Sequence, residues 1–332
     1  MSRSPAAAPD LLLDPPPCRC GLVVNPLALR NSRRPRLLRL LRERFAPLGE
    51  CFMIDPERNL TDVLTRWREE GIEMVAISGG DGTIHLIVDE IIRLWAGHPL
   101  PCFLFLHGGT TGFVARETGT AAAGRVSARL AEACAQNRPI PARYVDTLTV
   151  GERHVFCFGL GIFRTLSLEY ITRGGLAGLS HILLGLRFAG SWATGGNLAR
   201  RALQPLPWRI VIDSEEIPPE HFVGLFAAGL PSLKIFRAYQ AIPCPTDSFR
   251  LVGIQPAGAL TLLRGIRPVI SGNAGSLPSE IRLQGIRELR VEGQAGERVP
   301  YMADGEYYSE PERLIATKGP RLTVLLPDLI TA

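Results

Sequence analysis

The feature that most constrains this fold is an apolar segment that runs directly into a cluster of glycines. Met74-Val75-Ala76-Ile77 predicts a buried strand, Ser78-Gly79-Gly80-Asp81-Gly82-Thr83 follows it, and residues 84–95 have the apolar periodicity of a helix. Glycines let the backbone turn tightly and bring N–H groups against phosphate oxygens, and the helix N-terminus directs partial positive charge to the same place. This order predicts a phosphate-binding loop at the end of a buried strand.

Further strands and helices alternate with this unit along the first half of the chain. Short strands are expected at 22–24, 51–54, 74–77 and 102–106. Helices are expected from the first strand's loop to residue 48, and at 60–70, 84–95 and 125–135. Strands that alternate with helices at this spacing form a parallel sheet covered by helices. We therefore predict an α/β fold whose first domain, residues 20–143, is a Rossmann-like parallel-sheet domain.

Two more loops follow strands of this predicted sheet. Asn25-Pro26 ends the first strand, and Gly108-Gly109-Thr110-Thr111-Gly112 follows the strand at 102–106. Parallel-sheet enzymes bind ligands at the carboxyl ends of their strands, so these loops and the first glycine loop are expected to line one crevice. Each loop alone could be an ordinary turn, and the prediction depends on their convergence.

Carboxylates stand in two of the motifs. A buried Asp81 is costly unless it meets a cation or a proton to accept, so it is expected to contact metal and nucleotide or to act as a general base. The alternative is a capping role for the helix that follows it. Near the C-terminus, Asp304 and Glu306 flank Gly305 and could divide such roles, although Asp-Gly alone is typical of a hairpin turn.

From about residue 144 the sequence changes to short apolar runs separated by turn residues. The runs lie at 147–150, 154–159, 208–212, 222–228, 249–254, 286–291 and 322–326. They predict an antiparallel, β-rich second domain over residues 144–327, interrupted by one helix at 176–188, with the last segments free to pack back on the first domain. The Ala- and Pro-rich leader, residues 1–19, is expected to be disordered because it has little apolar content to bury.

Charge and cysteine content restrict the cellular setting. The formal charge of +5 is carried almost entirely by arginine, since Lys234 and Lys318 are the only lysines, and a guanidinium fork suits phosphate. The arginine bias could equally reflect a GC-rich genome. The seven cysteines include no C-x-x-C pair, which indicates reduced thiols in the cytoplasm. No apolar run reaches the roughly 20 residues that span a bilayer.

Four motifs, taken in order, carry a resemblance to a known family. VVNP at 23–26, SGGDGT at 78–83, GGTTGFVAR at 108–116 and ADGE at 303–306 resemble the diacylglycerol kinase and sphingosine kinase family of lipid kinases, whose catalytic domain is distantly similar to NAD kinases. The resemblance runs from Gly21 to Pro327. It implies a nucleotide-binding α/β domain and a β-sandwich-like second domain, with ATP and Mg²⁺ in an active-site cleft between them. It also implies phosphorylation of a lipid hydroxyl group.

The resemblance further implies roles for single residues. The catalytic base falls on Glu306, with Asp304 beside it, in the pattern of bacterial members, or on Asp81 in that of sphingosine kinases. Bacterial relatives hold a structural Mg²⁺ at an Asp-Gly-Leu turn, where this chain has Asp247-Ser248-Phe249, so Asp247 is a candidate metal ligand. Nucleotide contacts fall on Asn25, Pro26, Gly79, Gly80, Asp81, Gly82, Thr83 and Thr110.

The chain also departs from the family pattern. Leu27-Ala28-Leu29-Arg30 replaces the usual Ser-Gly after the first loop, Leu86 and Asp89 replace a Glu and an Asn, and Gly112 replaces the Asn of G-T-x-N. The departures motivate one alternative function, a catalytically weakened lipid- or nucleotide-binding regulator of the same fold. A second alternative is an NAD kinase-like enzyme that acts on a soluble substrate.

A lipid kinase must reach a membrane, and two segments could serve. Arg36, Arg39 and Arg42 oppose the leucine face of a predicted helix and would suit an anionic surface, although a solvated charged face explains them as well. Residues 176–188 could line an acyl-chain slot or pack the second domain. We expect a cytoplasmic protein, peripheral at the inner face of the membrane, with a membrane lipid as substrate. A homodimer is left open, and nucleic acid is not expected because the basic stretch lacks interleaved aromatics.

Overall fold

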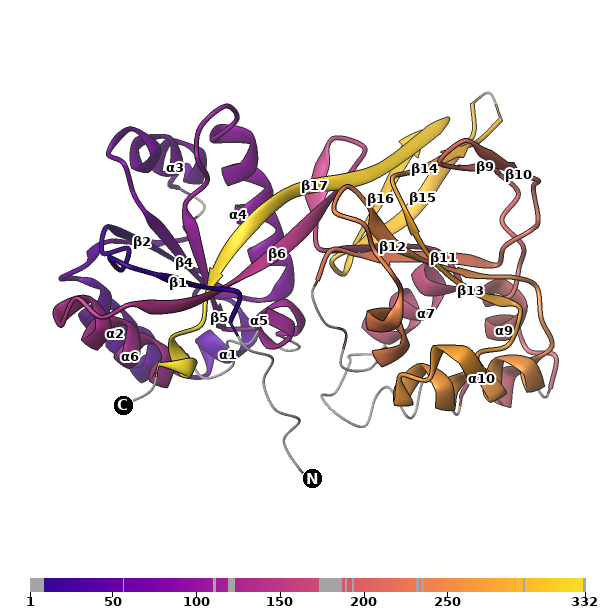
Figure 1. The fold of residues 1–332 in the computed structure, drawn as a ribbon, viewed down its shortest axis with the longest axis horizontal. Helices are drawn as coiled ribbons and strands as arrows, with labels where there is room; N and C mark the ends of the chain where they lie inside the picture. The colour runs from indigo at the N-terminus through magenta and orange to yellow at the C-terminus, as the bar shows by residue number, and fades with distance from the viewer. Residues whose placement is uncertain are drawn as a thin grey trace. The chain divides into compact units, whose positions relative to one another are not determined.

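The chain forms two compact units, which Figure 1 shows as ribbons in a computed structural model. Unit 1 comprises Met1–Asp146 and Arg321–Ala332, and unit 2 comprises Thr147–Pro320. The structure describes residues 9–55, 57–109, 112–118, 123–172, 187–188, 190–192, 194–230, 233, 236–294 and 296–330.

Unit 1 is built on a parallel sheet. Its strands run in the order β5-β4-β2-β3, and the final part of β17 (Arg313–Leu325) pairs parallel with β5 through Val324 and Phe103. The bounds are Cys20–Val24 for β2, Gly49–Met53 for β3, Met74–Gly79 for β4 and Cys102–His107 for β5. Every residue of β2 and β4 is buried, as expected for central strands covered on both faces. The predicted α/β architecture is confirmed.

Helices cover this sheet on both faces, with α2 beside α6 and α3 beside α4 (Figure 1). Their bounds are Leu29–Ser32 for α1, Pro35–Phe45 for α2, Leu60–Glu69 for α3, Asp81–Leu94 for α4, Phe113–Thr118 for α5 and Ala123–Ala135 for α6. The single helix predicted to reach residue 48 is instead divided. Pro35 starts α2, and the residue before a proline avoids helical geometry, as Arg34 does at φ −134° and ψ 61°.

Trp67 of α3 fixes that helix against the sheet. Its ring is fully buried over Gly21, where an added Cβ would lie 2.3 Å from the nearest ring carbon. The indole N–H donates to Glu50 Oε2 at 2.7 Å, so this polar group has a hydrogen-bond partner although the ring is buried. A glycine is therefore required at position 21, because any side chain there would collide with the Trp67 ring.

The leader contains a strand, so the prediction of disorder over residues 1–19 is wrong for residues 9–19. Leu11–Leu13 form β1, which pairs antiparallel with β6 (Ile140–Val150) from Leu11 opposite Ala142 to Leu13 opposite Ile140. Leu11 and Leu13 pack against the buried core of unit 1. The two alternate leucines supply enough apolar surface for an edge strand, which composition alone did not reveal.

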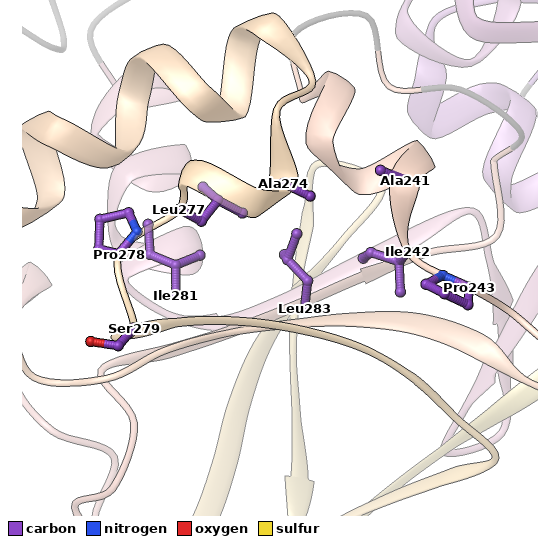
Figure 2. A pocket seen from close by; sticks show the side chains of 9 residues that line it. All are labelled: Ala241, Ile242, Pro243, Ala274, Leu277, Pro278, Ser279, Ile281 and Leu283. Atoms are coloured by element: carbon purple, nitrogen blue, oxygen red, sulfur yellow. The ribbon is translucent and has the colours of Figure 1, made fainter.

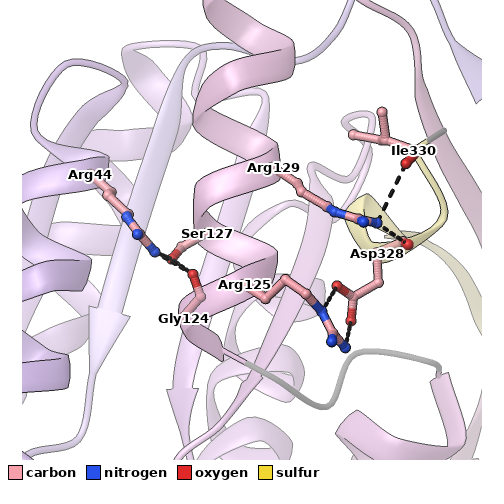
Figure 3. Close-up of polar contacts among 7 residues, drawn as sticks. All are labelled: Arg44, Gly124, Arg125, Ser127, Arg129, Asp328 and Ile330. Carbon is pink, nitrogen blue, oxygen red and sulfur yellow. Dashed lines mark hydrogen bonds and ion pairs between the residues drawn. The ribbon is translucent and has the colours of Figure 1, made fainter. Parts of the chain in front are cut away.

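The C-terminal segment docks on α6 of unit 1 (Figure 3). Arg125 makes a two-point contact with the Asp328 carboxylate, at 2.8 Å and 3.2 Å. Arg129 donates to the carbonyl oxygens of Asp328 and Ile330, and Arg44 of α2 donates to Gly124 O and Ser127 Oγ at the start of α6. Residues 321–330 therefore belong to unit 1, although the chain reaches them only after unit 2 is complete.

Unit 2 is a β-sandwich-like domain, as predicted. One layer is an antiparallel sheet in the order β13-β12-β11-β8-β15-β16. These strands span Ile281–Ile286 for β13, Phe249–Ile254 for β12, Gly224–Ala228 for β11, Cys157–Gly161 for β8, Arg298–Ala303 for β15 and Glu306–Pro311 for β16. The other layer contains the end of β6, the start of β17, and β7 (Arg153–Val155), β9 (Arg209–Ile212), β10 (Glu215–Ile217) and β14 (Glu288–Glu292). A common core, which includes Leu160 and Leu225 of the first layer and Ile210 and Leu289 of the second, holds the layers together.

Helices of unit 2 differ from the prediction. The structure has α7 (Ile162–Thr172), α9 (Asn197–Ala202) and α10 (Ala259–Ser271), together with short 3₁₀ turns η1 (Arg237–Ala241) and η2 (Ala274–Ser276). None of these was predicted. The helix predicted at 176–188 lies outside the described residues except for its last two positions, which are helical.

Candidate functional site

Three loops meet at the carboxyl edge of the parallel sheet of unit 1. Asn25 N donates to Ser78 O at 2.9 Å, Gly108 N donates to Gly79 O at 2.9 Å, and Arg30 N donates to Gly108 O at 2.9 Å. These backbone bonds tie the segments after β2, β4 and β5 to one another. The predicted convergence is thus present within a single unit, at the edge where parallel-sheet proteins bind ligands.

Glycines allow this close approach. A Cβ on Gly109 would lie 2.3 Å from Gly80 Cα, and a Cβ on Gly79 would lie 2.6 Å from Thr83 Cβ. Gly80 precedes α4, which begins Asp81-Gly82-Thr83, and the first helical bond there runs from Ile84 N to Gly80 O at 3.0 Å. The N–H groups of the first turn therefore have no acceptor inside the helix, which is the arrangement that receives anions.

Side chains lock the first loop to α4. Asn25 Nδ2 donates to Thr83 Oγ1 at 2.9 Å, and Asn25 Oδ1 accepts from Leu27 N at 3.0 Å in the turn that contains Pro26. Asn25 and Thr83, both predicted site residues, are thus in direct contact. Thr110, the remaining predicted nucleotide contact, lies outside the described residues.

Asn31 is a residue of this site that the sequence did not reveal. It is buried, and its Nδ2 donates to Asn25 O at 2.8 Å and to Ser78 O at 3.1 Å. A Cβ on Gly108 would strike the Asn31 side chain at 2.5 Å, so this glycine is also required by close packing. In the sequence, Asn31 stands out only as an amide directly after the altered Leu27-Ala28-Leu29-Arg30 segment. No neighbouring residue in the sequence indicates that it binds the loops after β2 and β4.

Asp81 binds backbone rather than capping its own helix. Its Oδ2 accepts from Phe113 N at 3.0 Å and its Oδ1 accepts from Val114 N at 2.9 Å, at the start of α5. The carboxylate therefore fastens the second glycine loop to the first. The roles of Asp81 as nucleotide contact and as base stay predictions.

Two arginines and a histidine lie at this edge of the sheet. Arg30 and Arg116 supply positive charge, and His107 supplies an imidazole. Arg30 Nη1 lies 3.3 Å from His107 Nδ1 at the end of β5. Burial lowers the pKa of His107, and the charges of Arg30 and Arg116 lower it further, while Asp81 and the Gly109 backbone act in the opposite direction. Burial also lowers the pKa of Arg30, with Arg34 and Arg116 contributing. The loops thus lie in an electropositive environment.

In unit 2 the Asp304-Gly305 turn joins β15 to β16. Asp304 has φ +50° and Gly305 φ +92°, which is the left-handed pair of a tight hairpin. The Asp304 carboxylate is buried and accepts from Phe156 N at 2.9 Å and from Cys157 N at 2.8 Å, where the chain enters β8. Asp304 is placed to hold the hairpin against the neighbouring strand.

Glu306, the residue after this turn, is exposed. It lies beside Tyr307, whose pKa is raised chiefly by burial and in part by the negative charge of Glu306. Tyr307 OH donates to Ser167 Oγ of α7 at 3.1 Å, which fixes the start of β16. Of the two carboxylates predicted around Gly305, Glu306 is the one that solvent reaches.

Asp247, the candidate metal ligand, lies in an exposed turn of unit 2. Asp247 is exposed, in a turn closed by Ser248 N donating to Pro245 O at 3.0 Å. Across the part of the chain that the structure describes, no group of three or more His, Cys, Asp and Glu side chains is placed to hold a metal ion. The metal site at Asp247 therefore stays a prediction.

An apolar pocket of about 320 Å³ lies in unit 2 (Figure 2). The side chains of Ile242, Leu277, Ile281 and Leu283 surround it, and Ser279 supplies the one polar side chain among those that line it. It lies beside α10 and between η1, η2 and β13. Its lining side chains are mostly apolar, while polar atoms make up about half of its exposed surface. Within the described ranges, none of the helices has the length and apolar character needed to cross a bilayer.

Comparisons with known proteins agree with this geometry. Residues 19–145 match the family model of the diacylglycerol kinase catalytic domain. A diacylglycerol kinase structure from Bacillus anthracis str. Sterne superposes with a TM-score of 0.54 at 15% identity, covering 93% of this chain and 96% of that one. A second structure from that strain, also assigned to the diacylglycerol kinases, gives 0.62 at 16% identity, covering 94% and 99%. At these identities the likeness shows the fold alone. No curated protein matches the chain.

Proposed function

We propose that this chain is an ATP-dependent kinase of the diacylglycerol kinase family that phosphorylates a lipid hydroxyl group, since its residues 19–145 match the catalytic domain of that family. A kinase domain of this family is typical of a phosphotransferase, and ATP is proposed as the phosphate donor. The observation that carries the proposal is the convergence of the Asn25, Gly79–Thr83 and Gly108–Gly109 segments on one edge of a parallel sheet. The lipid acceptor, the metal and the membrane are the further parts of the proposal.

The first loop and α4 fit the phosphates of a nucleotide. Gly109 packs its backbone directly against Gly80, where a Cβ on Gly109 would collide with Gly80 Cα, so the two glycine loops are held together as a cradle at the start of α4. The first-turn N–H groups of α4 and the Arg30 and Arg116 charges offer donors and positive potential. Asn25, Asn31 and Asp81 keep the three loops in register through the bonds given above, so that the cradle exists before the ligand arrives.

Glu306 is proposed as the base that accepts the proton of the attacking hydroxyl group. It is exposed, and a base must be within hydrogen-bond reach of the substrate hydroxyl. Asp304, buried and held by Phe156 N and Cys157 N, is proposed as a positioning residue that keeps the turn before Glu306 in shape. When bound, ATP supplies the phosphoryl group, and the protein supplies position and charge.

The apolar pocket of unit 2 supports a lipid as acceptor. A lined volume of about 320 Å³ could receive part of an acyl chain, and its lining is almost free of polar side chains. Arg36, Arg39 and Arg42 are exposed on α2, whose opposite face buries Leu41 and Phe45. We propose that this arginine face meets anionic lipid headgroups.

Mg²⁺ is proposed to enter with the nucleotide rather than to occupy a protein cage. The described residues offer no carboxylate cluster of the kind that holds a resident ion. Magnesium in kinases is held largely by phosphate oxygens, with few protein ligands. Phosphate transfer should therefore stop in excess EDTA and return with added Mg²⁺, while the thermal midpoint of the protein without nucleotide stays the same.

The test of the function is transfer of labelled phosphate from ATP to lipid. Wild-type protein is incubated with γ-labelled ATP and mixed vesicles that contain diacylglycerol, monoacylglycerol, a sphingoid base or ceramide, and the lipid fraction is analysed. A labelled lipid that disappears in Glu306→Gln is the expected result. No labelled lipid, with an active kinase control present, would refute the proposal.

The same assay separates the alternatives. Labelled NADP from NAD, without labelled lipid, favours an NAD kinase-like enzyme. ATP or lipid binding without any transfer, together with a cellular phenotype that survives Glu306→Gln and Asp81→Asn, favours a regulator that kept the fold.

A further inference from the structure

His107 ends β5 at the centre of the three loops, but none of the family motifs assigns it a function. It is 6% exposed, and its ring lies where a side chain at position 112 would begin. A Cβ on Gly112 would be 2.2 Å from His107 Cδ2 and 2.4 Å from Nε2. The imidazole therefore occupies the space that a side chain at position 112, such as the asparagine of G-T-x-N, would need.

The hydrogen bonds of the ring determine its tautomer. Arg30 Nη1 lies 3.3 Å from His107 Nδ1, and a guanidinium can only donate. Nδ1 must therefore accept, and in a neutral imidazole the proton then resides on Nε2. Burial and the charges of Arg30 and Arg116 lower the pKa of His107, which favours the neutral ring near pH 7.

Nε2 is a buried ring atom to which no atom of the described residues makes a hydrogen bond of adequate geometry, although the Gly109 backbone lies close enough to act on the ring. An unpaired buried donor is unfavourable, and an acceptor supplied by a bound ligand would explain why the protein retains it. Nε2 faces position 112, just before α5, next to the glycine cradle.

The electrostatic surroundings favour an anionic acceptor. Arg30 from α1 and Arg116 from α5 both act on the ring, and Asp81 is the one carboxylate that opposes them. Asp81 itself is bound to Phe113 N and Val114 N. A neutral N–H donor beside two guanidinium groups is suited to a phosphate oxygen.

We propose that His107 is a ligand-binding residue whose Nε2–H donates a hydrogen bond to a phosphate oxygen of the nucleotide held by the glycine loops. This inference rests on the proposed function, since it assumes a phosphate-bearing ligand. Arg30 holds the imidazole in the required tautomer, and Gly112 leaves room for the ring.

The test uses substitutions of His107 whose amide nitrogen can take the place of only one of the two imidazole nitrogens. In His107→Gln the amide nitrogen can take the place of Nε2, whereas in His107→Asn it can reach only the place of Nδ1. Binding of ATP and of inorganic tripolyphosphate to the full chain is measured by calorimetry, with exposed His98→Asn as the matched control. We expect His107→Asn to weaken both ligands about 10- to 100-fold, and His107→Gln and His98→Asn to stay within about threefold of wild type.

A spectroscopic measurement distinguishes direct contact between His107 and the ligand from a structural role of His107. In ¹⁵N spectra of the imidazole, Nε2 should be the protonated nitrogen before ligand is added, and its resonance should move on saturation with tripolyphosphate. Equal binding in all variants, equal loss in the Gln and Asn variants, an unchanged Nε2 resonance, or no binding by wild type would each overturn the inference. Labelled lipid without dependence on His107 would refute the inference alone. His107-dependent binding without labelled lipid would refute the proposed function alone.

Discussion

The glycine loops of unit 1 and the Asp304-Gly305-Glu306 turn of unit 2 each contain an aspartate that binds two backbone N–H groups. Asp81 holds Phe113 N and Val114 N, and Asp304 holds Phe156 N and Cys157 N. The two regions differ in what remains for a ligand. Unit 1 offers backbone, glycines and arginines, whereas unit 2 offers the exposed carboxylate of Glu306.

That difference assigns separate tasks to the two regions. A surface of N–H groups and guanidinium groups attracts phosphate, and an exposed carboxylate can accept a proton. The two aspartates, although both belong to the sequence motifs, shape these surfaces by anchoring backbone. Variants of each region should therefore affect different measured quantities.

Glu306→Gln should give the largest effect. General base catalysis contributes about 10²- to 10⁴-fold, so kcat for lipid phosphorylation should fall by that factor. ATP affinity and the thermal midpoint should not change, because Glu306 is exposed. Steady-state kinetics and a melting curve measure these quantities, with exposed Glu215→Gln of β10 as the control. A loss of ATP affinity equal to the loss in kcat would contradict the separation of tasks.

Gly109→Ala should damage the nucleotide end instead. The added Cβ would meet Gly80 Cα at 2.3 Å, and backbone cannot move aside as a flexible side chain can. Overpacking of this kind costs about 1–3 kcal/mol, so ATP affinity should fall about 10- to 100-fold and the unfolding free energy should also fall. The control is Gly124→Ala in α6, where the nearest atom would be 3.6 Å away and alanine favours the helix. Unchanged ATP binding in Gly109→Ala would mean that the cradle does not hold the nucleotide.

Asp304→Asn and Asp81→Asn test the shared anchoring role. At Asp81 the two backbone N–H groups bond different oxygens, so the amide leaves one of them without its acceptor. At Asp304 the Oδ1 atom accepts from both N–H groups, so the amide chiefly removes the charge that strengthens these buried bonds. Urea unfolding should show a loss of about 1–3 kcal/mol for buried Asp304, and a smaller loss for half-buried Asp81. Asp213, which accepts from Arg287 N and Glu288 N but is exposed, is the matched control and should change least. Full stability of Asp81→Asn with loss of transfer would instead identify Asp81 as the base.

The smallest effect concerns the pH dependence of stability. The folded pKa of His107 lies below its ordinary value of 6.5. Between the two values the unfolded chain binds a proton that the folded chain does not, so the unfolding free energy decreases as the pH falls through this range. The slope is at most about 1.4 kcal/mol per pH unit, and it disappears above pH 6.5. Urea unfolding from pH 5.5 to 8 should show a flatter profile in His107→Gln, and an identical profile would contradict the lowered pKa.

Local patterns in the sequence predicted the parallel sheet well, because a run such as Met74–Ile77 between turn residues has few other outcomes. The short β1 was missed, since Leu11 and Leu13 become a strand only by pairing with β6. α10 was missed because Pro268 falls inside it. Two predicted strands are each divided, at Phe156 and at Arg287, where the chain passes between the layers of unit 2.

The site was predictable only as far as glycines and motif residues mark it. Asp81 finds its partners 32 residues away, and Asp304 finds Phe156 at a separation of 148, so no local pattern could reveal that they anchor backbone. Asn31 and His107 have no motif of their own, and their importance appears only when Gly108 and Gly112 are seen to make room for them.

Hydrogen–deuterium exchange with and without ATP tests the central claim most directly, since it maps the nucleotide end on the whole protein. ATP should slow exchange in peptides that cover residues 78–84 and 107–109 of unit 1, and should leave residues 302–307 of unit 2 unchanged when no lipid is present. Protection at the Asp304-Gly305-Glu306 turn, or none at the glycine loops under saturating ATP, would contradict the account.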